Sequence, residues 1–232
     1  GLGTIENLYI SGTIKGESNI GGVVGYQESG IVRNVYNLAT IEGVSNVGGI
    51  VGNMRSGTIR ETFNHAKITS SGQYSGGIVG YAYYNTIIDD NYNRGEIKGS
   101  SYVGGIAGAV TSAYRNNSYL RRNYSASLVS GKSNVAGVVA TTGGYTTNTY
   151  NYYDTTMLTD FDPGEGYTKP VVTNHSQGKT SDVLLDSDVT KLGFSTSIWI
   201  SKAKVNDYNY YPELKAYAEN TRQAIREDSK ES

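Results

Sequence analysis

A short glycine-rich phrase occurs five times in the first 140 residues of this 232-residue chain. In each copy two small residues precede a pair of mostly branched apolar residues and a third small residue, at 21–25, 48–52, 76–80, 104–108 and 136–140. The second positions of the copies, 22, 49, 77, 105 and 137, lie 27, 28, 28 and 32 residues apart. A period of this length is typical of a stack of structural units that bury their apolar faces against one another.

Two further columns of residues keep the same period. One is aromatic and is followed in most copies by a polar residue, and the other is β-branched. The aromatic column contains Tyr9, Tyr36, Phe63, Tyr92, Tyr124 and, as we expect, Tyr150, and the β-branched column contains Ile14, Ile41, Ile68, Ile97 and Val129. Apolar and polar residues alternate with a period of two around these positions, and Gly, Asn and Ser separate the runs, as in strands joined by turns.

These patterns predict an all-β fold, a β-solenoid (parallel β-helix) of about five to six coils over residues 1–154. Successive coils would lie about 4.8 Å apart, so that equivalent residues stack. We therefore expect Asn19 to stack on Asn46 and Tyr74 on Tyr102. A prism or sandwich of antiparallel hairpins is an alternative that the period alone leaves open.

One arc of the repeat varies in length. From each aromatic residue to the next glycine pair the distance is 13 or 14 residues. From each glycine pair to the next aromatic residue it is 13 to 19 residues. Insertions in repeat arrays lie on one face, which is often the binding face. Because Tyr and Arg are favoured at protein contacts, the longest variable arc predicts a binding patch. Its members are Tyr114, Arg115, Tyr119, Arg121 and Arg122.

The repeat pattern ends after residue 154. We interpret residues 155–211 as a loop and capping segment, in which Phe194 and Trp199 plug the open end of the solenoid. A ligand pocket at Trp199 is the alternative. Residues 212–232 form a C-terminal helix or linker, because Pro212 suits a first helical turn and a modest apolar stripe follows it at helical spacing.

The residues that carry chemistry are sparse. His65 and His175 are the two histidines, neither is next to a glutamate, and the chain has no cysteine. Asp89 and Asp90 form the one adjacent acidic pair of the repeats, which we interpret as a polar turn rather than a catalytic pair. We expect no catalytic residue and no cofactor.

A weak calcium site is suggested by Asp160, Asp162 and Glu165, which lie close together in a loop-like segment. This segment lacks the residue spacing and the flanking helices that make a calcium loop specific. A solvated loop is therefore the preferred interpretation.

The charge balance excludes some classes of partner. Twenty basic and 21 acidic residues give a formal net charge of −1, and no block of like charges occurs, so we expect no nucleic-acid partner. No apolar run approaches the ~18 residues of a membrane span, and we do not expect the first residues to be a signal peptide. We expect the sequence to be a segment of a longer protein.

The glycine-rich phrases resemble the GLUG repeat of secreted and surface-anchored bacterial proteins, among them the Gram-positive zinc metallopeptidases that cleave immunoglobulin A. The resemblance extends from residue 1 to about 215. Residues 148–154 are similar to the last repeat of the family. The closing segment of the family is similar to 192–194, Trp199 and 211–214. The leucine of the motif is Val or Ile here, and the last copy has two alanines in place of glycines. The zinc signature His-Glu-x-x-His is absent.

The resemblance implies a non-catalytic module, secreted or on the cell wall of a Gram-positive bacterium. It would position a neighbouring domain of its parent chain, such as a zinc metallopeptidase domain, or help that domain to bind its target. The partners would be adjacent domains and a host protein, such as an immunoglobulin, or a host glycan. Two alternatives are an adhesin module that itself binds a host glycan or protein, and a carbohydrate-active β-helix enzyme.

Overall fold

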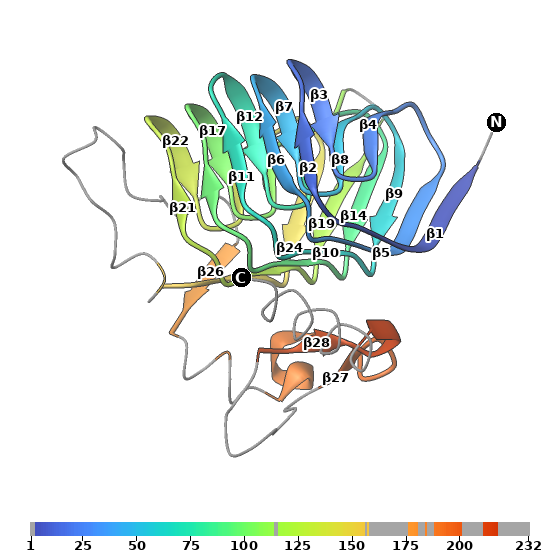
Figure 1. Ribbon diagram of the computed structural model, residues 1–232. Helices are drawn as coiled ribbons and strands as arrows, with labels where there is room; N and C mark the ends of the chain where they lie inside the picture. The colour runs from blue at the N-terminus through green and yellow to red at the C-terminus, as the bar shows by residue number, and fades with distance from the viewer. Residues whose placement is uncertain are drawn as a thin grey trace. The chain divides into compact units, whose positions relative to one another are not determined.

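The computed structural model describes residues 3–113, 116–155, 157, 176–180, 184, 188–200 and 211–217. It divides into two compact units, Gly1–Ser181 and Asp182–Ser232. The first unit is a parallel β-solenoid of about six coils (Figure 1). The predicted fold is confirmed, and the antiparallel alternative is wrong because every strand pair between successive coils is parallel.

The largest sheet has 11 strands and contains two rows that meet at the long strand β5 (Ile31–Asn37). One row continues from β5 through β9 (Gly57–Arg60), β14 (Thr86–Asp89), β19 (Ser118–Arg121) and β24 (Thr146–Thr149). The other contains β1 (Thr4–Ile10), β5, β10 (Phe63–Asn64), β15 (Tyr92–Asn93), β20 (Tyr124–Ser125), β25 (Asn151–Asp154) and β26 (Ser176–Lys179).

Three five-stranded sheets complete the coils, and we name each by its first strand. The β2 sheet contains β2 (Thr13–Lys15), β6 (Thr40–Gly43), β11 (Ile68–Ser70), β16 (Ile97–Lys98) and β21 (Val129–Ser130). The β3 sheet contains β3 (Ser18–Gly21), β7 (Ser45–Gly48), β12 (Gln73–Gly76), β17 (Ser101–Gly104) and β22 (Ser133–Ala136). The β4 sheet contains β4 (Val24–Gln27), β8 (Val51–Met54), β13 (Val79–Ala82), β18 (Ala107–Thr111) and β23 (Val139–Gly143).

The register between coils confirms the columns that the sequence predicts, with one correction. Ile14, Ile41, Ile68, Ile97 and Val129 are successive partners, as are Tyr9, Tyr36, Phe63, Tyr92 and Tyr124. The next partner of Tyr124 is Tyr152, so the prediction of Tyr150 was wrong. Tyr150 occupies the bend before β25 with a left-handed backbone (φ 57°), and its side chain is 56% exposed.

Two apolar clusters fill the interior of the coils. One lies between the 11-stranded sheet and the β4 sheet and includes Ile59, Ile78, Ile88 and Ile106, all without exposed surface. The other lies between the β2 and β3 sheets and contains the isoleucine column with Val47, Val103 and Val135. Each coil thus repeats the same burial, and this explains why the apolar pattern has a fixed period.

The glycine pairs and the polar column are parts of one structural feature. Asn37, Asn64 and Asn93 are fully buried, and each amide nitrogen of the first two donates to the side-chain oxygen one coil further on, at 2.8 Å. A Cβ on Gly49 would overlap the Asn64 side chain and the carbonyl oxygen of Gly77. Glycine is therefore required there because the backbone of one arc packs directly on the asparagine ladder.

The second unit contains two short strands and two 3₁₀ helices within its described part. Strand β27 (Trp199–Ile200) pairs antiparallel with β28 (Glu213–Leu214), and the helices are η3 (Val189–Leu192) and η4 (Lys215–Tyr217). The buried rings of Phe194 and Trp199 stack at 4.7 Å. That these rings plug the solenoid stays a prediction.

The start of the C-terminal segment differs from the predicted helix. Strand β28 follows Pro212 directly, because Leu214 pairs with Trp199 and is buried. Residues 218–232 lie outside the described residues.

Candidate functional site

Three residues of the predicted binding patch lie together on β19 and the bend after it. The Arg121 guanidinium lies over the ring of Tyr119, 4.6 Å from its centre, and Arg122 follows in a left-handed conformation (φ 56°). Tyr114 and Arg115 lie outside the described residues. The binding role of this patch stays a prediction.

Both arginines are engaged by the acidic pair of the preceding coil. Arg121 binds Asp89 through two nitrogens at 3.0 and 2.6 Å, and Arg122 binds Asp90 at 3.0 and 2.9 Å and Asp89 at 3.1 Å. The hydrogen bond with Asp90 is the main cause that raises the pKa of Arg122. The carboxylates are nearly buried, with side chains 8% and 4% exposed, so they are engaged by arginine rather than directed at solvent. This geometry favours an inter-coil clamp, in which Asp89 ends strand β14 and Asp90 lies in the bend after it.

His65 lies beside the aromatic ladder. Its ring centre is 4.8 Å from that of Phe63 and 5.6 Å from that of Tyr92. Burial lowers the pKa of the His65 imidazole from 6.5 to about 3, and the nearby Arg94 guanidinium adds to this effect. A partly buried, neutral imidazole in an aromatic environment fits a packing role. His175 lies outside the described residues, as do Asp160, Asp162 and Glu165 of the weak calcium candidate.

A second group of aromatic residues lies on the outside of the coils, over the β3 and β4 sheets. We call it the tyrosine surface, and its members are Tyr26, Tyr74, Tyr81, Tyr83, Tyr84 and Tyr102. All six side chains are partly or largely exposed, Tyr26 to 46% and Tyr84 to 40%. They come from three coils. The first and the last of them, Tyr26 and Tyr102, are 76 positions apart in the sequence.

The rings of the tyrosine surface form a continuous series of contacts. Tyr74 stacks on Tyr102 and on Tyr81, in each case with 4.9 Å between ring centres. Tyr81 stacks on Tyr83 at 5.4 Å. The hydroxyl group of Tyr83 then lies 3.2 Å from that of Tyr26. These contacts order the rings before any ligand arrives.

An ion pair closes one end of the tyrosine surface. The hydroxyl group of Tyr26 donates to the Glu28 carboxylate at 2.9 Å, and Glu28 also binds Arg55. The Arg55 guanidinium lies 5.4 Å from the centre of the Tyr84 ring, which in turn contacts Tyr83. The charges at this end therefore cancel.

The sequence pattern identified only part of the tyrosine surface. It predicted the stacking of Tyr74 on Tyr102, which is confirmed, but it did not connect that pair with the other four tyrosines. A signal was present, because Tyr26 and Tyr81 each follow the last glycine of a glycine-rich phrase. In the register they are two coils apart, on either side of Asn53.

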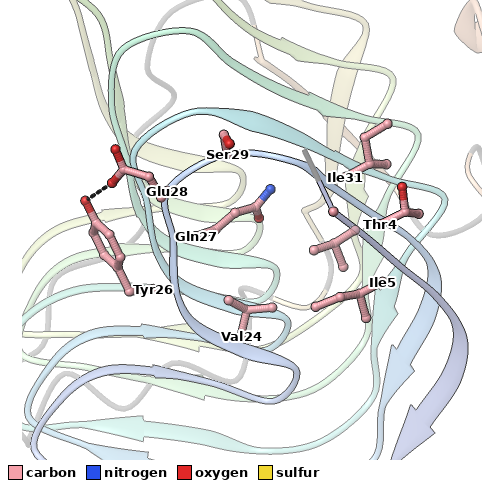
Figure 2. Close-up of a pocket in the computed structure, with 10 residues that line it drawn as sticks. Thr4, Ile5, Val24, Tyr26, Gln27, Glu28, Ser29 and Ile31 are labelled. Atoms are coloured by element: carbon pink, nitrogen blue, oxygen red, sulfur yellow. Dashed lines mark hydrogen bonds between the residues drawn. The ribbon is translucent and has the colours of Figure 1, made fainter. Parts of the chain in front are cut away.

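A hollow of about 310 Å³ lies next to the tyrosine surface, between β1 and the turn from β4 to β5 (Figure 2). Val24 and Gln27 point into the coil, whereas Tyr26 and Glu28 lie on the other side of the backbone (Figure 2). The Gln27 amide nitrogen donates to the Gly30 carbonyl at 3.1 Å, and its amide oxygen is buried without a partner among the described residues. The hollow exposes part of the interior of the first coil.

The described residues contain neither a cluster of metal-ligating side chains nor a helix suited to a membrane crossing. None of the His, Asp and Glu side chains there form a group of three or more that could hold a metal ion. In the same part of the chain, no helix has the length and hydropathy that a membrane crossing needs.

The GLUG motif matches residues 16–42. This segment begins before β3 and ends within β6, so it covers one period of the solenoid, and the resemblance found in the sequence is confirmed there. No curated protein and no solved structure matches the chain. The structure adds that the matched segment is one unit of a longer repeat, because its strands have a partner at the same register in later coils.

Proposed function

We propose that this chain is a rigid, non-catalytic repeat module of a secreted or cell-surface bacterial protein. Its role would be to position a neighbouring domain or to help that domain bind its target. The single observation that carries this proposal is the unbroken register of aromatic, β-branched and glycine columns along the coils. Such a stack holds its two ends at a fixed separation, because each coil is bonded to the next through every sheet.

The location and the parentage rest on the GLUG motif. GLUG repeats occur in secreted and surface-anchored bacterial proteins, and the motif matches residues 16–42. The neighbouring domain would be catalytic or adhesive. We include the zinc metallopeptidases of Gram-positive bacteria that cleave immunoglobulin A as the parent class that the resemblance suggests.

A change in the number of coils tests the positioning role. Deleting residues 31–57 would join Gly30 to Thr58, which occupies the position of Ile31 in the register, and would keep all six residues of the tyrosine surface. The shortened solenoid should keep cooperative unfolding and lose about 5 Å of length. In the parent protein, this deletion should reduce action on a large target but not on a small soluble one. Equal action of both proteins on the large target would contradict the proposal.

A second candidate function is an adhesin module that binds a host protein or glycan by itself. The tyrosine surface is the observation that favours it, since an ordered, exposed aromatic surface exceeds what a spacer needs. A pull-down of serum proteins and a glycan panel would separate the two roles.

A further inference from the structure

One column of the solenoid contains tyrosines where its other members are asparagines. The column precedes the first small residue of each phrase by two positions, and all its members have a left-handed backbone. They are Asn19 (φ 55°), Asn46 (φ 52°), Tyr74 (φ 62°), Tyr102 (φ 54°) and Asn134 (φ 51°). Asparagine adopts this conformation readily, whereas a bulky side chain is strained in it. The fold is therefore served by asparagine at this position, and the two tyrosines need another explanation.

The strained tyrosines are also the ones that build the tyrosine surface. Tyr74 and Tyr102 stack on each other, and Tyr74 extends the series to Tyr81. A third member, Tyr84, has a left-handed backbone as well (φ 70°). Residues held in sparsely populated backbone regions are concentrated at functional sites, because the surrounding structure must offset their cost. Half of the tyrosine surface is made of such residues.

We propose that the tyrosine surface is a binding site for an uncharged glycan chain. The inference goes beyond the positioning role, which requires no ligand, and it gives the adhesin candidate a site and a class of ligand.

The chemistry of the side chains selects a sugar over other ligands. The face of an aromatic ring is electronegative, so it attracts the polarised C–H groups on the apolar face of a pyranose ring. Tyrosine adds a hydroxyl group at the ring edge, which can exchange hydrogen bonds with sugar hydroxyls. A ring and a hydroxyl group together match the alternation of apolar faces and polar edges in a saccharide.

The local charge favours an uncharged glycan. Glu28 and Arg55 neutralise each other at one end of the surface, and the Tyr26 hydroxyl hydrogen-bonds to the same carboxylate. Burial is the main cause that raises the pKa of Tyr74. The pKa of Tyr26 is raised mainly by its hydrogen bond with Tyr83. These phenols thus stay neutral in the physiological pH range. An acidic polymer would find no net positive charge at this surface.

The layout favours a chain of sugars over a single one. The rings of three coils follow one another in a row of contacts. Because the rings are held by one another and by hydrogen bonds, little side-chain freedom would be lost on binding.

The test is affinity electrophoresis of the full chain in gels that contain β-glucan, xylan, mannan or chitin oligosaccharides, or neutral O-glycans freed from mucin. We expect at least one of these glycans to retard the chain. The double variant Tyr74→Asn/Tyr102→Asn should bind that glycan about ten-fold more weakly or worse, as for a central aromatic contact. Its urea midpoint should stay close to that of the unmodified chain, because relief of strain in the left-handed backbone offsets the lost ring stacking.

Tyr150→Asn is the matched control. Tyr150 also has a left-handed backbone and an exposed side chain, but it lies at the bend before β25 and is not part of the tyrosine surface. This variant should bind as the unmodified chain does. Should the double variant fail to fold, Tyr26→Ala and Tyr84→Asn, which alter the two most exposed rings, should each still weaken binding.

Three results would overturn the proposal. They are no retardation by any glycan of the panel, equal binding by the unmodified chain and the tyrosine variants, or capture of a deglycosylated protein through the same tyrosines. None of these results affects the positioning role, which is tested by the number of coils alone.

Discussion

Two groups of aromatic residues in this solenoid share a residue type and differ in almost everything else. The aromatic ladder, Tyr9, Tyr36, Phe63, Tyr92 and Tyr124, has one ring in each coil, and its successive rings stack nearly parallel at 4.7–5.3 Å. The tyrosine surface takes four residues from one coil, Tyr74, Tyr81, Tyr83 and Tyr84, and none from the coil before it. The rings of the tyrosine surface lie on the outer face of the coils and are partly or largely exposed, whereas Phe63, Tyr92 and Tyr124 are at most 1% exposed.

The difference shows how a repeat protein can separate stability from recognition. The ladder accepts phenylalanine at residue 63, so its packing depends on the ring and not on the hydroxyl group. On the tyrosine surface the equivalent positions in other coils carry asparagine, as at Asn46, so nothing in the fold demands an aromatic ring there. We expect mutations in the two groups to have opposite consequences.

The largest effect should follow truncation in the ladder. Phe63→Ala would open a cavity between Tyr36 and Tyr92, and we expect the free energy of unfolding to fall by about 3–5 kcal/mol. Urea denaturation measures this loss. Phe63→Tyr, which copies the neighbouring coils, is the control and should change stability by about 1 kcal/mol or less. Similar stability of the alanine variant and the unmodified chain would show that the ladder does not hold the coils together.

The pH dependence of stability should reveal the histidine beside the ladder. Because the folded-state pKa of His65 is lowered to about 3, the unfolded chain takes up this proton first as the pH falls below 6.5. The contribution of neutral His65 to the free energy of unfolding is therefore present above pH 6.5 and is lost as the pH falls toward 3. Between pH 7 and pH 4 the free energy of unfolding should fall by up to about 3 kcal/mol from this cause.

His65→Leu isolates this contribution, because Leu38 is the residue at that position in the preceding coil. The variant should lose less stability than the unmodified chain between pH 7 and pH 4 in urea titrations. Identical pH profiles for the two proteins would argue that His65 titrates normally in the folded state.

A smaller effect is expected at the clamp between coils. Arg122→Gln removes the guanidinium group from Asp90 and one contact from Asp89, and both carboxylates are nearly buried. Since Arg122 itself is partly exposed, we expect a loss of about 1–2 kcal/mol on denaturation. Lys15→Gln is the control, as its pair with Glu42 is exposed and should contribute under about 0.5 kcal/mol. A variant that kept full stability but lost partner binding would instead support the predicted binding patch.

The smallest effect on stability is expected on the tyrosine surface. In Tyr102→Asn, relief of backbone strain of about 1 kcal/mol would offset a lost stacking contact of about 0.5–1.5 kcal/mol. The free energy of unfolding should therefore change by about 1 kcal/mol or less, as urea denaturation would show. A loss as large as that of Phe63→Ala would remove the contrast between the two groups.

The sequence by itself determined the coil. A residue that must be buried, or must lack a side chain, recurs wherever the same backbone position recurs, so Ile41, Phe63 and Gly49 each reveal a column. The period favours parallel stacking, in which equivalent residues lie over one another, and the structure excludes the antiparallel alternative because the strands of successive coils pair in parallel. The limit of this reasoning is visible at the last aromatic position, where the register selects Tyr152 and places Tyr150 in the bend.

Only the tertiary structure decided the surfaces. The contact of Tyr26 with Tyr83 joins non-equivalent positions of two coils, and Arg122 and Asp90 lie at equivalent positions where the residue type does not repeat. Periodicity reports what every coil must share, whereas a binding surface arises from what a few coils do differently. Which of those exceptions meet in space depends on the angle at which the sheets turn and on the side-chain conformations, and neither leaves a periodic trace in the sequence.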